Sequence, residues 1–156
     1  MEYGLQDRVA LITGSSHGIG KAIASALARE GADIIISGRR LDALVSVRTE
    51  LESFGRSVHS CYVDARDGQS VRFLLDNVVA KIGRLDILVN NAGTTANGKI
   101  GTLSDSDWDK VVDVNLSAVF RVTRAFLPLL YRSEKGRILN VASRLGVRGG
   151  AGASNY

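Results

Sequence analysis

Short apolar segments rich in β-branched residues alternate with segments of helical periodicity five times along this chain. The short segments predict buried strands at residues 8–13, 33–37, 58–63, 86–90 and 137–142. The stretches between them predict helices at residues 19–30, 41–54, 67–82, 104–112 and 116–131. Strands that alternate with helices pair in parallel through right-handed crossovers. The sequence therefore predicts an α/β fold, a parallel sheet with helices on both faces.

Local signals define several helix ends and faces. The first helix is expected to end at Gly31, and its predicted apolar side consists of Ile23, Ala26 and Leu27. Ser104 followed by Asp107 fits an S-x-x-D capping pattern, so a helix is expected to begin there. The last long helix, over residues 116–131, is strongly apolar.

Composition excludes several classes of protein. The net charge is +4, and no basic block is longer than Arg39-Arg40, so the patch that nucleic-acid binding requires is missing. One cysteine, Cys61, and two histidines leave no disulfide framework and little basis for a metal site. No apolar run approaches the ~20 residues of a membrane span, and the first residues lack the order of a signal peptide. These features predict a reduced, cytoplasmic, single domain over residues 1–156 with no membrane or nucleic-acid partner and no metal.

A glycine-rich turn separates the first predicted strand from the first helix. Gly14, Gly18 and Gly20 follow the spacing G-x-x-x-G-x-G, with Ser15, Ser16, His17 and Ile19 between them. Glycine allows a sharp turn and a close approach of the backbone to a pyrophosphate, which the helix N-terminus then attracts. A nucleoside-triphosphate P-loop is excluded, because it requires glycine at Ser15 and Ser or Thr at Ala22. These residues are therefore predicted to bind the phosphates of a dinucleotide.

The end of the second predicted strand indicates which dinucleotide binds. An acidic residue at this place would hold the ribose hydroxyls of NAD. Here the strand ends in Ser37-Gly38-Arg39-Arg40, with no carboxylate and with guanidinium groups suited to a phosphate. The sequence favours NADP(H) over NAD(H), with Arg39 and Arg40 as candidate ligands of the 2′-phosphate.

The glycine turn, together with Asn90-Asn91-Ala92-Gly93, resembles the short-chain dehydrogenase/reductase family, and the resemblance covers the whole chain in order. It implies a doubly wound Rossmann-type fold with sheet order 3-2-1-4-5, and hydride transfer between a nicotinamide and a carbonyl or alcohol. By the same resemblance Asn90 braces the sheet. The remaining cofactor contacts that it implies come from Asp64, which would contact the adenine, and from Ala65, Asn91, Ala92 and Gly93.

The resemblance also implies the catalytic groups. Asn115 matches the family asparagine and would help to hold a proton-relay water. Ser143 would bond the substrate oxygen, and Tyr156 would transfer the proton as general acid. A phenol with an ordinary pKa of about 10 requires a nearby cation for this role. The family supplies a lysine four residues after the tyrosine, and the sequence ends at Tyr156.

These features lead to further expectations about the chain. We expect it to be the N-terminal part of a longer protein, lacking the family's C-terminal strands and helices and inactive by itself, with residues 137–142 as an exposed sheet edge. The helix over residues 116–131 lies in a subunit interface in the family, so a homo-oligomer is expected. Short sequence segments such as Asp113-Val114-Asn115-Leu116 resemble the β-ketoacyl-(acyl-carrier-protein) reductase branch of the family. This resemblance suggests a 3-oxoacyl thioester as the substrate.

Three other interpretations compete with the reductase. A non-catalytic dinucleotide-binding module stays open, because fold alone does not establish function. A sugar-nucleotide epimerase or dehydratase usually carries G-x-x-G-x-x-G, which the spacing of Gly14, Gly18 and Gly20 does not match. A purely structural domain would not need three glycines in one turn.

Overall fold

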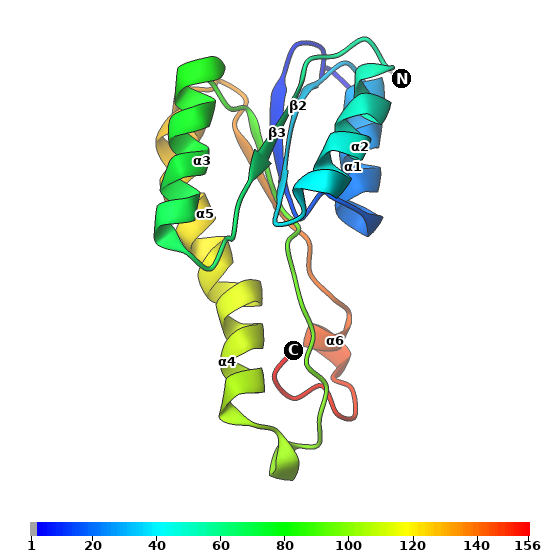
Figure 1. Ribbon diagram of the computed structural model, residues 1–156, viewed down its shortest axis with the longest axis vertical. Helices are drawn as coiled ribbons and strands as arrows, with labels where there is room; N and C mark the ends of the chain where they lie inside the picture. The colour runs from blue at the N-terminus through cyan, green and yellow to red at the C-terminus, as the bar shows by residue number, and fades with distance from the viewer. Residues whose placement is uncertain (1–2) are drawn as a thin grey trace.

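A computed structural model describes residues 3–156, and its centre is a five-stranded parallel sheet in the order β3-β2-β1-β4-β5 (Figure 1). The strands are β1 (Val9–Thr13), β2 (Asp33–Gly38), β3 (Val58–Tyr62), β4 (Ile87–Asn90) and β5 (Arg137–Asn140). Every pair of neighbouring strands runs parallel. The doubly wound Rossmann-type sheet, including its strand order, is therefore confirmed.

Helices cover both faces of the sheet. They are α1 (Gly18–Arg29), α2 (Leu41–Glu52), α3 (Gly68–Lys81), α4 (Asp105–Val112), α5 (Ala118–Tyr131) and the short α6 (Leu145–Arg148). Figure 1 shows α1 and α2 on one side of the sheet and α3 and α5 on the other. Helices α4 and α6 lie beyond the sheet, in an extension below it.

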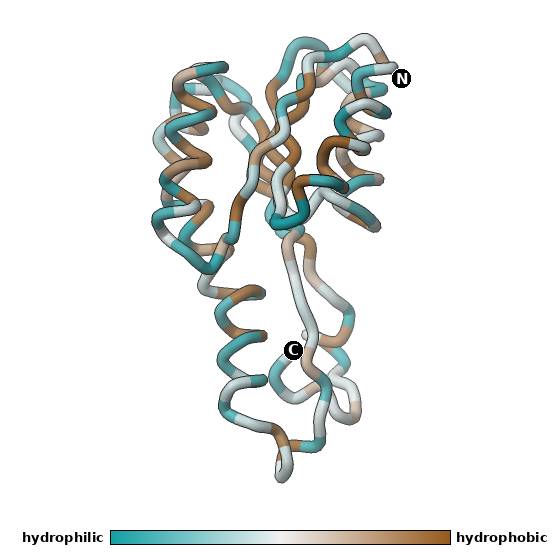
Figure 2. Tube along the Cα trace, in the orientation of Figure 1, coloured by the Kyte–Doolittle hydropathy of each residue, from teal (hydrophilic) through white to brown (hydrophobic). Residues whose placement is uncertain are grey.

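Side chains of the central strand alternate between two hydrophobic cores. Leu11 of β1 packs toward α3 and α5, in a cluster that includes Leu74 and Phe126. Its neighbour Ile12 packs toward α1 and α2, in a cluster that includes Leu44. This follows from the two-residue period of a strand, because successive side chains point to opposite faces. All five residues of β1 are buried, and the first four are apolar, as expected for a strand that is covered on both faces. Figure 2 shows hydrophobic residues in the interior of the sheet.

The buried side of α1 differs from the predicted one. Gly20, Ala24 and Ala28 are buried against the sheet, whereas Ala26 is exposed. Residues four apart lie on one helix face, and small side chains on that face let the helix approach the strands closely. The predicted apolar side was thus wrong at Ala26, although Ile23 and Leu27 still pack at the margin of the core.

Helices α4 and α5 join through one π-helical turn over Asp113–Ser117. The sequence pattern predicts two separate helices, the second beginning near residue 116, and this division is wrong. The capping prediction at the other end is confirmed, because the Ser104 hydroxyl accepts a hydrogen bond of 3.1 Å from the Asp107 N–H. Pro128 lies within α5.

The C-terminal segment packs on the loop that follows β4. The Gly98 N–H donates to the Gly152 carbonyl at 2.8 Å, and Gly98 pairs with Ala153 in an isolated parallel bridge. The buried Asn155 side chain donates to the carbonyls of Ala96 and Asp107. These contacts tie the segment before Tyr156 to the base of α4.

Strand β5 forms one edge of the sheet, and its four residues are exposed. The predicted exposed edge is therefore confirmed. Within residues 3–156, no helix combines the length and the apolar character that crossing a bilayer demands.

Candidate functional site

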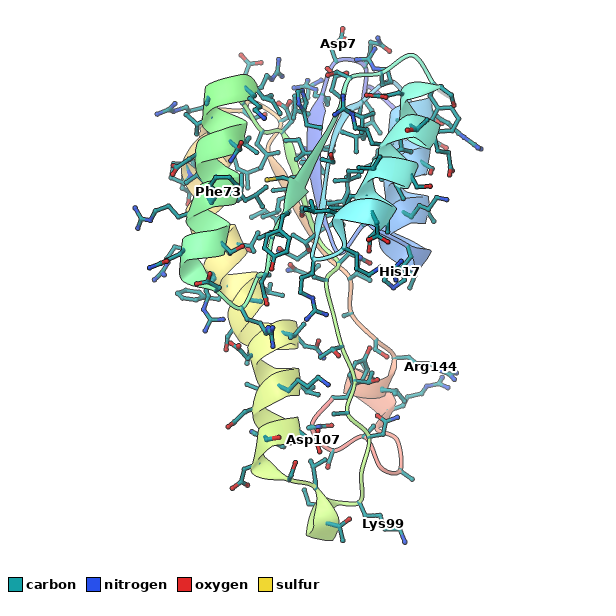
Figure 3. The ribbon with its side chains drawn as sticks, viewed as in Figure 1. Asp7, His17, Phe73, Lys99, Asp107 and Arg144 are labelled. Carbon is teal, nitrogen blue, oxygen red and sulfur yellow. The ribbon has the colours of Figure 1, made fainter. Side chains whose placement is uncertain are left out.

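A cavity of about 310 Å³ opens at the carboxyl ends of β1, β2, β3 and β4. Such an end of a parallel sheet is the usual place for a ligand in doubly wound folds. Figure 3 labels His17 at this end, where α1 begins. The lining residues come from four segments, Gly14–Gly20 without Ser15, Gly38–Arg40, Val63–Arg66 and Asn91–Thr94, with Lys110 and Val114 from the α4 side. Every residue predicted to bind the cofactor lines this cavity except Ser15.

Two glycines of the turn are required by close packing. Gly14 has φ +64°, and a Cβ there would lie 2.8 Å from the Ala92 Cα. A Cβ on Gly20 would collide with the Asn91 side chain and lie 2.5 Å from the Gly14 carbonyl oxygen. Only glycine lets the turn, the start of α1 and the end of β4 approach so closely. Gly18, by contrast, has φ +57° with open space beside it, so its surface faces the cavity.

The N-terminus of α1 offers unpaired donors to the cavity. His17 is the N-cap residue, and no side chain caps the helix. The first N–H groups of a helix have no partner within the helix, and its dipole is positive at this end. Ser16 and His17 bond to each other at 2.9 Å and also line the cavity. The arrangement suits a phosphate group.

Ser15 has a structural position, and it is the one predicted cofactor ligand that does not line the cavity. The residue is fully buried, and its hydroxyl lies within hydrogen-bond distance of the Ile12 carbonyl and of the Ser37 carbonyl and N–H. Its own N–H donates to the Ser37 carbonyl at 3.1 Å. Both polar groups of Ser15 are thus used to hold the turn against the end of β2.

The end of β2 presents two cations. Arg39 and Arg40 are exposed and line the cavity, whereas Ser37 and Gly38 before them are buried. Among the described residues, neither arginine forms an ion pair within 4.0 Å. Their charges are therefore available to an anionic ligand.

The end of β3 carries the only carboxylate among the cavity-lining residues, Asp64. Its oxygens accept hydrogen bonds from the Arg66 guanidinium, the shortest at 2.6 Å, and from the Arg66 N–H at 3.1 Å. The side-chain bonds from Arg66 lower the pKa of Asp64 below its ordinary value, although burial alone would raise it. The charge of Arg39 adds a further, smaller lowering. Asp64 is thus a carboxylate held by a guanidinium.

The end of β4 is braced from both sides. The Asn91 side chain donates to the carbonyls of Thr13 and Gly14, and the Thr13 hydroxyl accepts from the N–H groups of Asn91 and Ala92. The Asn90 side chain donates to Thr123 of α5 at 3.0 Å and to Asn140 of β5 at 2.8 Å. The bracing role expected for Asn90 is therefore confirmed by its contacts.

The three predicted catalytic residues lie on three different segments. Asn115 is in the π-helical turn, and its amide donates to the Thr94 carbonyl and accepts from the Thr94 N–H, at 2.9 and 2.8 Å. This side chain braces the loop after β4, and its role in holding a proton-relay water stays a prediction. The Ser143 hydroxyl accepts from the Leu145 N–H at 3.2 Å. Tyr156 is partly exposed, and no hydrogen bond within residues 3–156 joins it to Ser143 or Asn115.

Six cavity-lining residues were not among the predicted cofactor ligands: Gly38, Val63, Arg66, Thr94, Lys110 and Val114. Arg66 could have been found, because it follows the third strand and the ends of parallel strands form the binding edge. Lys110 gave no signal, since it looks like any exposed residue of α4. Within residues 3–156, no three His, Cys, Asp or Glu side chains gather as metal ligands.

Comparison with known proteins places this geometry in a family context. A profile described as short chain dehydrogenase matches residues 8–156. The 3-oxoacyl-[acyl-carrier-protein] reductase FabG of Thermotoga maritima is 39% identical over 155 residues, which are 97% of this chain and 62% of the relative. The chain thus spans about 62% of the length of this curated relative.

Solved structures agree with the sequence relatives. An alcohol dehydrogenase from Thermococcus sibiricus complexed with 5-hydroxy-NADP superposes with a TM-score of 0.93 at 34% identity, covering 97% of this chain and 64% of that one. The F189W actinorhodin polyketide ketoreductase with NADPH gives a TM-score of 0.92 at 36% identity, covering 96% and 58%.

Proposed function

The chain belongs to the short-chain dehydrogenase family, and from this premise we propose that it binds NADP(H) in an oxidoreductase that interconverts a carbonyl and an alcohol. The observation that carries the proposal is the cavity at the strand ends, which is lined by a glycine turn and by two arginines that form no ion pair within the described residues. When bound, the nicotinamide cofactor would supply or accept the hydride. Residues 1–156 form the dinucleotide-binding domain in this proposal.

The pyrophosphate would be held by the glycine turn and the N-terminus of α1. Gly18 leaves open space, and the uncapped helix directs free N–H groups and a positive dipole end toward the cavity. A side chain at Gly14 or Gly20 would push the turn away from β4 and change the shape of this cradle. The residues present therefore fit a dinucleotide.

Preference for NADP(H) over NAD(H) rests on charge. The end of β2 offers Arg39 and Arg40, and the buried Ser37 and Gly38 leave no carboxylate to hold ribose hydroxyls or to repel a 2′-phosphate. A guanidinium binds phosphate through charge-assisted hydrogen bonds. The relatives solved with 5-hydroxy-NADP and with NADPH support the same choice.

Proton transfer would fall to Ser143 and Tyr156. The Ser143 hydroxyl would donate to the substrate oxygen, and the Tyr156 phenol would deliver the proton to that oxygen as negative charge develops there. Asn115 would act by holding the loop at Thr94, through the two hydrogen bonds of its amide.

The proposed substrate is a small carbonyl or alcohol compound, with a 3-oxoacyl thioester as the first candidate, because relatives named as 3-oxoacyl-[acyl-carrier-protein] reductases match 97% of this chain. The proposed partner is a second copy of the protein. Leu116, Phe120 and Tyr131 expose apolar side chains on α5 and the π-helical turn before it, and such a surface is commonly covered by a subunit. The cytoplasmic location expected from the sequence stays a prediction.

One observation favours a second candidate, a dinucleotide-binding module without turnover. All predicted cofactor ligands except Ser15 line one cavity, whereas no hydrogen bond within the described residues joins Ser143 to Tyr156. Binding of NADPH without oxidation of NADPH by a 3-oxoacyl thioester, in the presence of the protein, would favour this candidate over the reductase.

The test of the proposal is a binding titration of NADPH and NADH against the protein and its Arg39→Ala variant. We expect the original protein to prefer NADPH, and we expect the variant to lose about tenfold or more in NADPH affinity while NADH affinity stays within about twofold. Arg72→Ala is a matched control, since Arg72 is an exposed arginine of α3 outside the cavity. Equal affinities for the two cofactors, unchanged by Arg39→Ala, would contradict the proposal.

A further inference from the structure

Arg66 is the cavity-lining cation that neither the glycine turn nor the end of β2 explains. It lies two residues beyond Asp64, just after β3. Its Nε atom lies 3.0 and 3.2 Å from the two Asp64 carboxylate oxygens, and one terminal nitrogen lies 2.6 Å from the second oxygen. The Arg66 side chain is 41% exposed and that of Asp64 19% exposed, so the pair sits on the wall of the cavity with the guanidinium outermost.

The sheet order brings this pair to the arginines at the end of β2. Strand β3 pairs with β2 up to Gly38 and Tyr62, and the Val63 N–H donates to the Gly38 carbonyl at 3.0 Å. The next residues of both segments, Arg39 and Arg40 on one and Asp64 and Arg66 on the other, line the same cavity. The hydrogen bonds from Arg66 are the main cause of the lowered pKa of Asp64, and the charge of Arg39 adds a smaller effect in the same direction.

The turn after β3 does not depend on Arg66 for its shape. Asp67 caps α3 by accepting hydrogen bonds from the N–H groups of Gln69 and Ser70. The Ser70 hydroxyl accepts from the Asp64 N–H at 2.9 Å. With the helix capped and the Asp64 backbone anchored, an exposed Arg66–Asp64 pair adds little to stability. The Arg66–Asp64 pair instead influences the net charge of the cavity.

That charge matters because the negative charge of Asp64 opposes the positive charge of the two arginines that follow β2. A carboxylate beside Arg39 would cancel part of the attraction for a phosphate and would repel it directly. Arg66 bonds both carboxylate oxygens of Asp64, so the charge of this acid is balanced by Arg66. Three further basic side chains, Arg39, Arg40 and Lys110, line the same cavity.

We propose that Arg66 is a specificity-determining residue for the 2′-phosphate of the cofactor, positioned by Asp64, which it neutralises beside Arg39 and Arg40. This rests on the proposed binding of NADP(H). The guanidinium acts in two ways. It removes the repulsion from Asp64, and it places a further planar donor at the wall where the 2′-phosphate would lie. A nucleotide without the 2′-phosphate gains little from either effect.

The test uses two small probes, adenosine 2′,5′-bisphosphate and adenosine 5′-monophosphate, which differ by the 2′-phosphate alone. Their affinities are measured by calorimetry for the original protein and for Arg66→Ala, Arg66→Lys, Arg39→Ala and the exposed control Arg72→Ala. We expect Arg66→Ala to lower the affinity for the bisphosphate by about fivefold to tenfold and the affinity for the monophosphate by less than about twofold. Arg66→Lys keeps the positive charge but lacks the planar guanidinium. Its affinity for the bisphosphate is expected to lie between that of the original protein and that of Arg66→Ala.

A double variant separates the two effects of Arg66. Adding Asp64→Asn to Arg66→Ala removes the uncovered carboxylate, so bisphosphate affinity should recover in part if neutralisation contributes. Circular dichroism verifies that each variant is folded. Loss of both probes to the same degree in Arg66→Ala, or no change in either, would overturn the assignment of Arg66.

Failure of this inference can be told apart from failure of the proposed function. If Arg39→Ala still abolishes the preference for the bisphosphate while Arg66→Ala leaves it intact, Arg66 has no such role and NADP(H) binding stands. If the original protein does not prefer the bisphosphate over the monophosphate, both proposals are overturned.

Discussion

Two aspartates at opposite ends of the sheet, Asp86 and Asp64, are each paired with arginine, and their surroundings differ. Asp86 precedes β4 at the amino ends of the strands and has a side chain only 2% exposed. Asp64 follows β3 at the carboxyl ends and lines the cavity. An aspartate–arginine pair thus occurs once with a buried carboxylate and once with a carboxylate on the wall of the proposed binding site.

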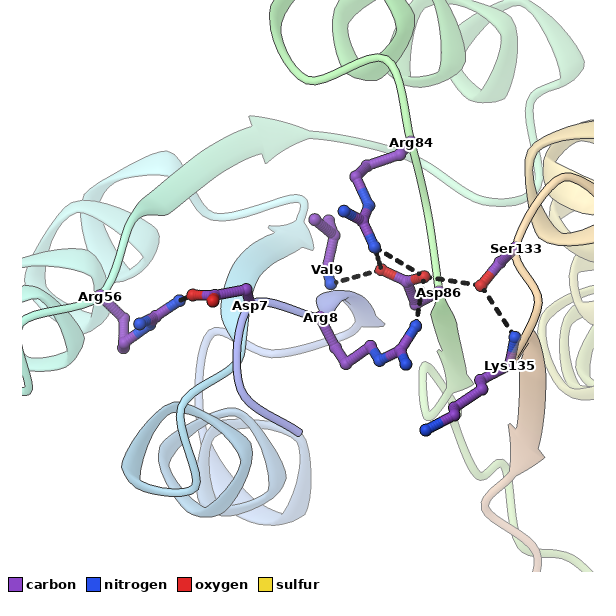
Figure 4. Close-up of polar contacts among 8 residues, drawn as sticks. All are labelled: Asp7, Arg8, Val9, Arg56, Arg84, Asp86, Ser133 and Lys135. Carbon is purple, nitrogen blue, oxygen red and sulfur yellow. Dashed lines mark hydrogen bonds and ion pairs between the residues drawn. The ribbon is translucent and has the colours of Figure 1, made fainter. Parts of the chain in front are cut away.

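The Asp86 carboxylate is surrounded by donors from three segments of the chain (Figure 4). It accepts from the Val9 N–H at 2.9 Å, from the Ser133 hydroxyl at 2.6 Å and from Arg84 at 2.9 Å, with Arg8 at 3.4 Å. Burial alone would raise the pKa of Asp86, but the bonds from Ser133, the Val9 N–H and Arg84, with the charge of Arg84, outweigh it and lower the pKa. Asp86 thereby joins β1, β4 and the segment after α5.

The Asp64 carboxylate accepts hydrogen bonds from Arg66 alone, through the backbone N–H and the guanidinium of that residue. Arg66 lies only two residues further along the chain. No other strand depends on its carboxylate among the described contacts. The difference shows that the value of an aspartate–arginine pair depends on what else the carboxylate holds. A buried carboxylate that satisfies a backbone N–H of another strand stabilises the fold, whereas a pair at a cavity wall mainly sets local charge.

The largest expected effect is on folding. Asp86→Ala removes the acceptor of a buried N–H and leaves Arg8 and Arg84 without their partner, so the free energy of unfolding should fall by about 3 kcal/mol. Urea unfolding followed by circular dichroism measures this. Asp76→Ala is the matched control, because Asp76 is an exposed aspartate of α3. A loss below about 1 kcal/mol would show that Asp86 is not the central tie between these strands.

Lowering the pH should reduce the contribution of Asp86 to the free energy of unfolding, with a smaller effect than Asp86→Ala. The pKa of Asp86 is lowered in the folded protein. Its contribution is therefore fully present above the ordinary aspartate pKa of about 3.9 and is lost as the pH falls through the folded pKa. The difference in unfolding free energy between the original protein and Asp86→Asn should shrink as the pH is lowered from about 5 to about 2. Urea titrations at several pH values measure it, and a constant difference would contradict this account.

The smallest expected effect is the stability change at the other end of the sheet. Asp64→Ala should lower the free energy of unfolding by only about 0.5 kcal/mol, since its partner Arg66 is exposed and α3 keeps its cap at Asp67. The same urea assay measures this change beside that of Asp86→Ala. If the two variants lose similar amounts, the contrast between a structural and a cavity-wall aspartate is wrong.

Much of the fold was predictable because its signals are local. The two-residue and 3.6-residue periods mark strands and helices, and Ser104 marks the start of α4 by its capping bond. The join of α4 and α5 was not predictable. A π-helical turn depends on packing on both sides, and no local pattern encodes it. The burial of Ala24 and the exposure of Ala26 likewise depend on the orientation of α1 about its own axis where it packs on the sheet.

The candidate site shows the same division. The sequence by itself determined a phosphate-binding turn, because Gly14 and Gly20 occur where only glycine permits the approach, and it determined that basic residues follow the second strand. Only the tertiary structure decided that the Ser15 hydroxyl bonds to the ends of β1 and β2 and that Arg66 lines the same cavity as Arg39. The reason is physical: strand order places side by side residues that are far apart in the chain, and burial then decides which polar groups stay free for a ligand.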